Sequence, residues 1–325
     1  MTAQPFKMLG SYAYYRTVDL ASLVDGLPGA RPLFFGDSGA HSARTLGINL
    51  TLDDYAAWCR RWDRQLTVYS NLDVIGAPEA TYANQKALEA KGLRPMPVFH
   101  TGTPWHWLER YLDEGYTYIA LGKLLGNPIK HVMPWLAKAF RLAQGRAVFH
   151  GFGMTVWPAL REFPFYSVDS STWGSGARYG DVSLFNGRNM VRVRLRDKAA
   201  VLAHRDLIAL HGADPAVLAS KANYDRRVVV GVCAVAYHRA EDFLRRRHGP
   251  IALPDGPYNP VARQTSAPAT DGLHLHLADT WDGNLTAAAA GLHLYLAETC
   301  RGDLHSASSA LDQYARPAQA KEVPA

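Results

Sequence analysis

The chain has 325 residues, of which 48% are hydrophobic and 20% charged. This composition excludes a globally disordered chain, and the length supports one barrel-sized α/β domain or two smaller ones. The formal net charge of +6 favours a polyanionic partner, although arginines on solvated faces would give the same balance.

Neither a membrane span nor a signal peptide is expected. The longest apolar run, Val228 to Tyr237, has about half of the ~20 residues that a bilayer requires. The first residues, MTAQPFKMLGSYAYYR, lack the apolar core of a signal peptide. The chain's 3 cysteines are too few and too scattered for a disulfide framework or a four-cysteine metal site. We therefore expect a cytoplasmic protein.

Short apolar runs alternate with amphipathic segments over the first two thirds of the chain. The apolar runs predict strands at Leu9–Tyr15, Pro32–Phe35, Leu66–Ser70, Met96–His100, Tyr116–Leu121, Ala147–Phe152, Phe165–Val168 and Met190–Leu195. The amphipathic segments predict helices at residues 51–64, Pro78–Lys91, Pro104–Glu114 and Ile129–Leu142. The first of these helices opens with a capping box, Thr51-x-x-Asp54.

Alternating strands and helices predict an α/β fold with a parallel sheet. Eight strands favour a (β/α)8 TIM-type barrel within residues 1–250, followed by trailing helices over Ala199–Arg247. An open doubly wound sheet is the alternative, but no Gly-x-Gly-x-x-Gly follows the first strand. Residues 251–325 are predicted to be a linker, Pro250–Thr270, and a small C-terminal extension. This extension holds a near-repeat, GLHLHLADT and GLHLYLAET, which suggests two strands around a small helix.

Polar residues and glycines follow most of the predicted strands. In a barrel the carboxyl ends of the strands surround the active site. The residues expected there are Asp37, Ser38, Gly39, Asp73, His100, Gly102, Gly122, Lys123 and Asp169. Two carboxylates in one cleft are the minimum for displacement at an anomeric carbon, because one attacks C1′ and the other handles the proton of the leaving group. Each aspartate has an alternative interpretation as a turn or helix cap.

The motifs DSGA, SNLD, PVFHTG, ALGKLLG, HGFGMT and SVDSSTW occur in this order over roughly residues 30–195. This set resembles the tRNA-guanine (queuine) transglycosylase superfamily. It is most similar to the short DpdA-type DNA 7-deazaguanine transglycosylases of phages and bacterial genomic islands.

The resemblance implies a role for each candidate residue. Asp169 matches the nucleophile that bonds to ribose C1′, Asp37 the proton-transfer aspartate, and Asp73 the acidic residue that binds the Watson–Crick edge of the base. Backbone and side chains at Ser38, Gly39, His100, Gly102, Gly122 and Lys123 would complete the base pocket. His41 stands where the tRNA enzymes stack an aromatic ring on the base, and a surface-turn histidine is the alternative.

The chain departs from the tRNA enzymes in two ways. It lacks their Cys-x-Cys-x-x-Cys zinc motif, and its length leaves no room for an additional tRNA-binding domain. Residues His274, His276, Cys300 and His305 could be imagined as ligands, but His-x-His on a strand is ordinary alternation, so no metal is expected. Both departures favour DNA over tRNA.

A group of arginines follows the predicted nucleophile. Arg178, Arg188, Arg192 and Arg194, with Arg196, could contact phosphates of a nucleic acid, and a charged edge strand is the alternative. The run Arg245–Arg247 suggests a solvated helix end.

The expected function is exchange of guanine in DNA for a 7-deazaguanine, with 7-cyano-7-deazaguanine the expected base. The reaction would use the free base as second substrate and no cofactor. The resemblance also allows an ATPase-like partner protein, a homodimer and, if the gene is a phage gene, the host cytoplasm. The alternatives are a tRNA-guanine transglycosylase without zinc and accessory domains, a non-catalytic nucleic-acid-binding subunit and a retaining glycoside hydrolase. Asp73 and the glycine-rich strand ends favour a nucleobase over a sugar subsite.

Overall fold

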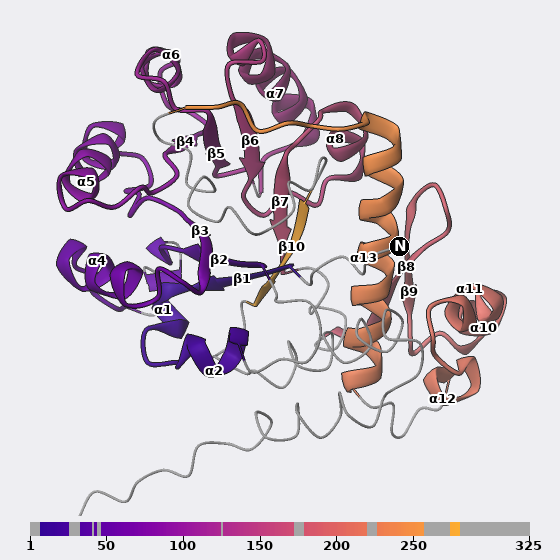
Figure 1. Cartoon of the computed structure of the whole chain (residues 1–325). Helices are drawn as coiled ribbons and strands as arrows, with labels where there is room; N and C mark the ends of the chain where they lie inside the picture. The colour runs from indigo at the N-terminus through magenta and orange to yellow at the C-terminus, as the bar shows by residue number, and fades with distance from the viewer. Residues whose placement is uncertain are drawn as a thin grey trace, which may run out of the picture.

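The computed structural model describes residues 7–25, 33–40, 42–43, 47–124, 126–171, 179–219, 226–256 and 274–279 (Figure 1). These residues form an α/β fold built on an 8-stranded parallel sheet with strand order β3-β2-β1-β10-β7-β6-β5-β4. The strands are β1 (Lys7–Ser11), β2 (Leu33–Asp37), β3 (Leu66–Tyr69), β4 (Val98–His100), β5 (Tyr118–Gly122), β6 (Val148–Gly151), β7 (Ser167–Ser170) and β10 (His274–Asp279). The expected α/β class and parallel pairing are confirmed.

Most of the helices lie on the outside of these strands (Figure 1). They are α1 (Tyr12–Tyr15), α2 (Leu20–Asp25), α4 (Leu52–Arg61), α5 (Pro78–Ala90), α6 (His106–Asp113), α7 (Ile129–Ala143), α8 (Trp157–Glu162), α10 (Lys198–Ala203), α11 (Arg205–Leu210), α12 (Pro215–Ala219) and α13 (Arg226–His248). Within the described part of the chain, no helix combines the length and apolar character needed to cross a membrane.

Local signals account for where several of these helices begin. The Thr51 hydroxyl accepts a hydrogen bond from the Asp54 backbone N–H (3.1 Å), as the capping box predicts. The same hydroxyl donates to the Asp54 carboxylate (2.6 Å), in place of the Thr51 backbone N–H that a capping box uses. Pro78 occupies the first turn of α5, where its missing N–H leaves no bond unmade. The expected helices at residues 51–64, Pro78–Lys91, Pro104–Glu114 and Ile129–Leu142 are thus confirmed to within a few residues.

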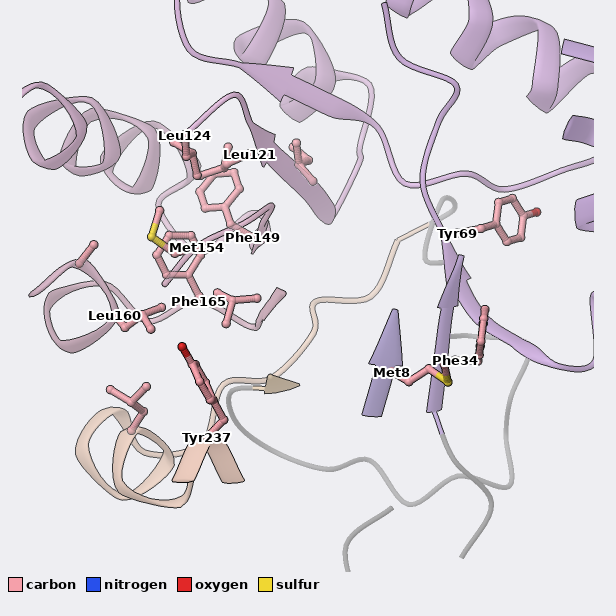
Figure 2. Packing of buried hydrophobic residues seen from close by; sticks show 14 of the residues in the cluster. Met8, Phe34, Tyr69, Leu121, Leu124, Phe149, Met154, Leu160, Phe165 and Tyr237 are labelled. Carbon is pink, nitrogen blue, oxygen red and sulfur yellow. The ribbon is translucent and has the colours of Figure 1, made fainter. Parts of the chain in front are cut away.

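Both faces of the sheet are buried. On the face toward the helices, Leu121, Phe149 and Phe165 gather with Leu160 of α8, and Tyr237 of α13 points toward them (Figure 2). The alternate residues of the strands form a second cluster on the opposite face, which consists of Leu9, Phe35, Val68, Met96, Val98, Tyr118, Ala120 and Val148. Strands buried on both faces are typical of parallel sheets.

Strands that are distant in the sheet order meet within this second cluster. The ring centroids of Phe35 in β2 and His150 in β6 lie 4.6 Å apart, although three strands separate β2 from β6. Segments next to the two edge strands are also in contact, because Ser70, which follows β3, and Met96, which precedes β4, form an isolated parallel bridge. Its hydrogen bonds run from Asn71 N–H to the Met96 carbonyl and from Met96 N–H to the Tyr69 carbonyl, each 2.8 Å long.

The structure corrects the expected position of one strand. Met190–Leu195, expected as the eighth barrel strand, instead forms β9 (Met190–Arg194), which pairs antiparallel with β8 (Asp181–Phe185) in a separate 2-stranded sheet. Val193 and Leu195 are buried and alternate with the exposed Arg192 and Arg194, and this one-sided burial is typical of antiparallel strands. The hairpin packs against α13 (Figure 1).

The C-terminal region supplies the missing strand. Residues 274–279, from the near-repeat, form β10 between β1 and β7, so a boundary after residue 250 does not separate the sheet from the tail. Ile251 and Leu253, at the start of the expected linker, pack against the second hydrophobic cluster. The rest of the linker, the second copy of the near-repeat, Cys300 and His305 lie outside the described residues. A smaller correction concerns Leu9–Tyr15, where the strand ends at Ser11 and α1 follows.

Candidate active site

Three aspartates come together at the carboxyl edge of the sheet. Asp37 is the last residue of β2, Asp169 lies in β7, and Asp73 follows β3. The Ser70 hydroxyl lies 3.5 Å from Asp37 Oδ1, and the charges of Asp73 and Asp169 both raise the pKa of Asp37. The charges of the predicted nucleophile and the predicted proton-transfer residue therefore interact in the folded chain, although the two residues are 132 positions apart in the sequence (169 − 37).

The surroundings of Asp37 bring its pKa close to neutral pH, where a carboxyl group can transfer a proton. Burial, followed by the charges of Asp73 and Asp169, raises its pKa from 3.8 to about 7. The Gly39 backbone N–H donates to Asp37 Oδ2 at 3.0 Å and opposes that shift. Gly39 has a φ of +77°, and a Cβ there would lie 2.5 Å from Ser11 Oγ, so only glycine fits this turn. A carboxyl group with this pKa can both donate and accept a proton at pH 7.

Asp73 is anchored through both of its carboxylate oxygens. Oδ1 accepts a hydrogen bond from the Ser38 hydroxyl at 3.1 Å, and Oδ2 lies 2.8 Å from Nε2 of His100. The side chains of His100 and Asp73 are only 6% and 10% exposed, so this pair is largely removed from water. Gly122 makes room for the imidazole, since a Cβ at this position would lie 2.7 Å from His100 Cδ2. Four residues of the expected base pocket thus form one contact network.

Gly122→Ala is expected to displace His100 and to lower the free energy of unfolding by about 1–3 kcal/mol, as overpacking of a dense site does. Urea denaturation of the wild type and the variant measures this cost. The matched comparison is the same substitution in a His100→Ala background, where the clash is relieved and the cost should be much smaller. An equal cost in both backgrounds would show that the crowding lies elsewhere.

Asp169 has two hydrogen-bond donors on a single oxygen. The Gly153 backbone N–H donates to Oδ1 at 2.9 Å, and Nε2 of His150 lies 3.2 Å from the same atom. Burial raises the pKa of Asp169 from 3.8 to about 7, opposed mainly by the bond from Gly153. The site therefore holds two carboxyl groups, Asp37 and Asp169, whose pKa values both lie close to neutrality.

The motif HGFG, which begins in the last two residues of β6, marks a part of the site that sequence reasoning did not assign. His150 and the Gly153 backbone contact Asp169. On the other ring nitrogen of His150, Nδ1 lies 2.6 Å from the hydroxyl of Ser167, which precedes Asp169 by two residues in β7. Ser70, directly after β3, links Asp37 to the Ser38 backbone. The Ser38 N–H donates to the Ser70 hydroxyl at 3.0 Å, and this hydroxyl is the one that lies near Asp37 Oδ1. His150 could have been found from its position at a strand end, whereas Ser167 and Ser70 carry no distinguishing signal.

Two other predicted residues lie at the outer part of this edge. Lys123 is exposed and has a φ of +57°, and its carbonyl accepts hydrogen bonds from Thr101 (2.8 Å) and Asn127 (2.7 Å). Gly102 is exposed in a turn with a φ of +85°. No contact joins either residue to the three aspartates, so a role in base binding remains a prediction for both. His41 lies outside the described residues.

Three of the predicted phosphate-binding arginines lie on the β8–β9 hairpin. Arg188, Arg192 and Arg194 are exposed, and Arg178 lies outside the described residues. Arg192 forms an ion pair with Asp181 and is therefore not a free cation, although its side chain remains 57% exposed. Trp157, the first residue of α8, connects the hairpin to the helix that follows the loop carrying Gly153, because its indole N–H donates to the Arg188 carbonyl at 3.1 Å.

No protein-family model matches the chain, and no curated protein or solved structure is significantly similar to it. Across the described ranges, no group of three or more His, Cys, Asp or Glu side chains is arranged to hold a metal ion. What the site offers is a cluster of three carboxyl groups, two of which titrate near pH 7, with a buried histidine beside Asp73 and another beside Asp169.

Proposed function

We propose that this protein is a transglycosylase that exchanges guanine in DNA for a free 7-deazaguanine base, with Asp169 as nucleophile and Asp37 as acid and base. The observation that carries the proposal is the proximity of Asp37 and Asp169 at the carboxyl edge of the parallel sheet, each with a pKa near 7. This arrangement supplies the attacking carboxylate and the proton donor that displacement at C1′ requires.

The proposal includes a closed (β/α)8 barrel. In a flat sheet, β2 and β6 would lie roughly 19 Å apart, given about 4.8 Å between neighbouring strands. The ring contact between Phe35 and His150, at 4.6 Å, requires the sheet to curve back on itself. The bridge between Ser70 and Met96 supports closure between the two edge strands, β3 and β4. A barrel would bring all of the strand ends to one rim, where active sites of this architecture lie.

In the proposed reaction, Asp169 attacks C1′ while the bond from C1′ to the guanine nitrogen breaks. The electron pair of that bond leaves with guanine, which takes up the proton of Asp37. Asp37 then removes a proton from the incoming 7-deazaguanine, whose nitrogen attacks C1′ and displaces the Asp169 carboxylate. Two inversions restore the original anomer, and the nucleic acid backbone is never cut. Asp37 ends the cycle protonated and Asp169 ionised, so the chemistry requires no cofactor.

We further propose that Asp73 binds the Watson–Crick edge of the base. Its carboxylate is an acceptor for the ring N–H and amino group that guanine and 7-deazaguanines share. Ser38 and His100 orient this carboxylate through one contact on each oxygen. Such support keeps a recognition group in place while one base leaves and another enters.

The nucleic acid is proposed to be DNA, with the target nucleotide flipped out of the duplex because C1′ is not open to in-line attack within the stack. The exposed Arg188 and Arg194 are candidates for phosphate contacts, and Trp157 holds the Arg188 backbone next to the loop that carries Gly153. Flipping costs a few kcal/mol, which an ATPase-like partner that opens the duplex would offset. Assembly as a homodimer is compatible with this scheme.

The test is exchange of radiolabelled guanine, measured side by side on duplex DNA, single-stranded DNA and tRNA. We expect incorporation into DNA and its replacement when 7-cyano-7-deazaguanine is added. Incorporation into tRNA alone would identify the chain as a tRNA enzyme instead. Tight binding of nucleic acid with no incorporation on any substrate would identify a non-catalytic subunit.

A further inference from the structure

A chain of buried hydrogen bonds runs from Asp169 into the second hydrophobic cluster. Nε2 of His150 contacts Asp169 Oδ1 at 3.2 Å, and Nδ1 on the opposite side of the ring contacts the Ser167 hydroxyl at 2.6 Å. The Ser167 hydroxyl in turn bonds to the phenol of Tyr118. His150 and Ser167 are 0% exposed and Tyr118 is 2% exposed, so water cannot replace these partners. None of the three takes part in the reaction proposed above.

The protons along this chain can be assigned from its chemistry. Burial lowers the pKa of His150 to about 3 and raises the pKa of Tyr118, so the imidazole and the phenol are both neutral near pH 7. An ionised Asp169 can only accept a hydrogen bond, which places the imidazole proton on Nε2. Nδ1 then accepts a hydrogen bond from the Ser167 hydroxyl, and the Ser167 oxygen accepts one from the Tyr118 hydroxyl. In the other tautomer the Nε2 lone pair would face the carboxylate, so an ionised Asp169 is compatible only with the tautomer that carries the proton on Nε2.

The imidazole is also held in one orientation. Its ring packs edge-on against Phe35, with centroids 4.6 Å apart and planes at 74°, and against Phe152, at 4.7 Å and 77°. These contacts come from β2 and from the loop after β6. With both nitrogens bonded and both neighbouring rings in place, the direction of the Nε2–H bond is fixed toward Asp169.

Both donors to Asp169, the Gly153 N–H and the His150 Nε2–H, reach Oδ1. Among the described residues, no side chain donates a hydrogen bond to Oδ2. Apart from Gly153, the only hydrogen bond that lowers the pKa of this carboxyl group comes from the backbone of Asp169 itself. Oδ2 is therefore the oxygen available to form a new bond, and Oδ1 is the oxygen that becomes the ester carbonyl.

We propose that His150 is a positioning residue that selects Oδ2 of Asp169 as the attacking oxygen and stabilises the carboxylate, with Ser167 and Tyr118 holding the imidazole in the required tautomer. This inference rests on the proposed function, because it assigns a role in the same displacement. In the first step the Oδ2–C1′ bond forms as the bond from C1′ to guanine breaks. In the second, the Oδ2–C1′ bond breaks and its electron pair returns to a carboxylate whose charge the two donors on Oδ1 already accommodate.

The test compares His150→Met with His150→Gln in the full chain. Methionine is of similar size but has no N–H, whereas the glutamine amide can donate to Asp169 from about the place of Nε2. We expect His150→Met to slow formation of the covalent adduct with DNA about 10- to 100-fold while KM for DNA stays within about twofold. His150→Gln should recover most of this rate. Equal rates for His150→Met and wild type, or no recovery with glutamine, would overturn the proposal.

Tyr118→Phe keeps the experiment decisive if His150→Met fails to fold. It removes only the terminal hydroxyl of the chain, and we expect a loss of a few fold in the rate of adduct formation. The matched control is Tyr116→Phe, because Tyr116 is equally buried and its hydroxyl bonds instead to Glu89 and Lys86. Equal rates for the two variants would contradict the inference. A wild-type protein that forms no adduct with DNA or tRNA would overturn the proposed function itself, and this inference with it.

Discussion

Asp169→Asn is expected to abolish the covalent protein–nucleic acid adduct and to lower base exchange by at least about 1,000-fold. An amide oxygen is a far weaker nucleophile than a carboxylate, and within the described part of the chain no second carboxyl group stands in the same position to replace it. The amide oxygen can still accept the hydrogen bond from the Gly153 N–H, which anchors Oδ1 at 2.9 Å in the wild type. Adduct formation is read on denaturing gels, and exchange is read with labelled guanine.

The stability of the same variant provides a control for folding. Folding raises the pKa of Asp169 from 3.8 to about 7, so the ionised carboxylate opposes folding at higher pH. Stability is therefore lost between about pH 4 and pH 7 in the wild type, and asparagine removes that loss. We expect a higher unfolding midpoint for Asp169→Asn at pH 8 and no gain below about pH 4. Base exchange that persists in a variant with this behaviour would show that another residue is the nucleophile.

The rate of adduct formation should follow a bell-shaped pH profile with its maximum near pH 7. Asp169 must lose its proton to attack, so the rate rises as pH increases through about 7. Asp37 must keep its proton to protonate the leaving base, so the rate falls as pH increases beyond about 7. Because the charge of Asp169 raises the pKa of Asp37, the two groups titrate as a pair, and the singly protonated pair is the active form.

Asp37→Asn should slow adduct formation about 100- to 10,000-fold and remove the descending limb of this profile, because the amide has no acidic proton to give. The ascending limb, which belongs to Asp169, should remain, and binding of the nucleic acid should stay largely intact. Asp113→Asn is the matched control, since Asp113 lies on α6, is 71% exposed and pairs with Arg146. A descending limb that survives in Asp37→Asn would assign the proton donor to another group.

Local sequence signals predicted many of the helices and strands correctly. The Thr51-x-x-Asp54 box and Pro78 mark helix starts through interactions within a few residues of the chain, so the sequence contains all of the information needed. Asp37 and His100 lie at observed strand ends for a similar reason, because the apolar runs before them define the strands. Parallel pairing then brings those ends to one edge of the sheet.

Strand partners were less predictable. The alternating patterns of Met190–Leu195 and of residues 274–279 look alike in the sequence, yet one forms an antiparallel hairpin and the other lies between β1 and β7. Alternation reports which residues of a strand share a face, and it carries no information about which strand lies next to it.

By itself, the amino-acid sequence determined the α/β class, most helix and strand positions and the three aspartates at the strand ends. Only the tertiary structure decided that Asp37 and Asp169 share one electrostatic environment and that His150, Ser167 and Tyr118 stand in line with Asp169. The physical reason is that propensity and capping act over a few residues along the chain. Burial and the hydrogen bonds that shift a pKa depend instead on neighbours that only the folded chain brings into contact.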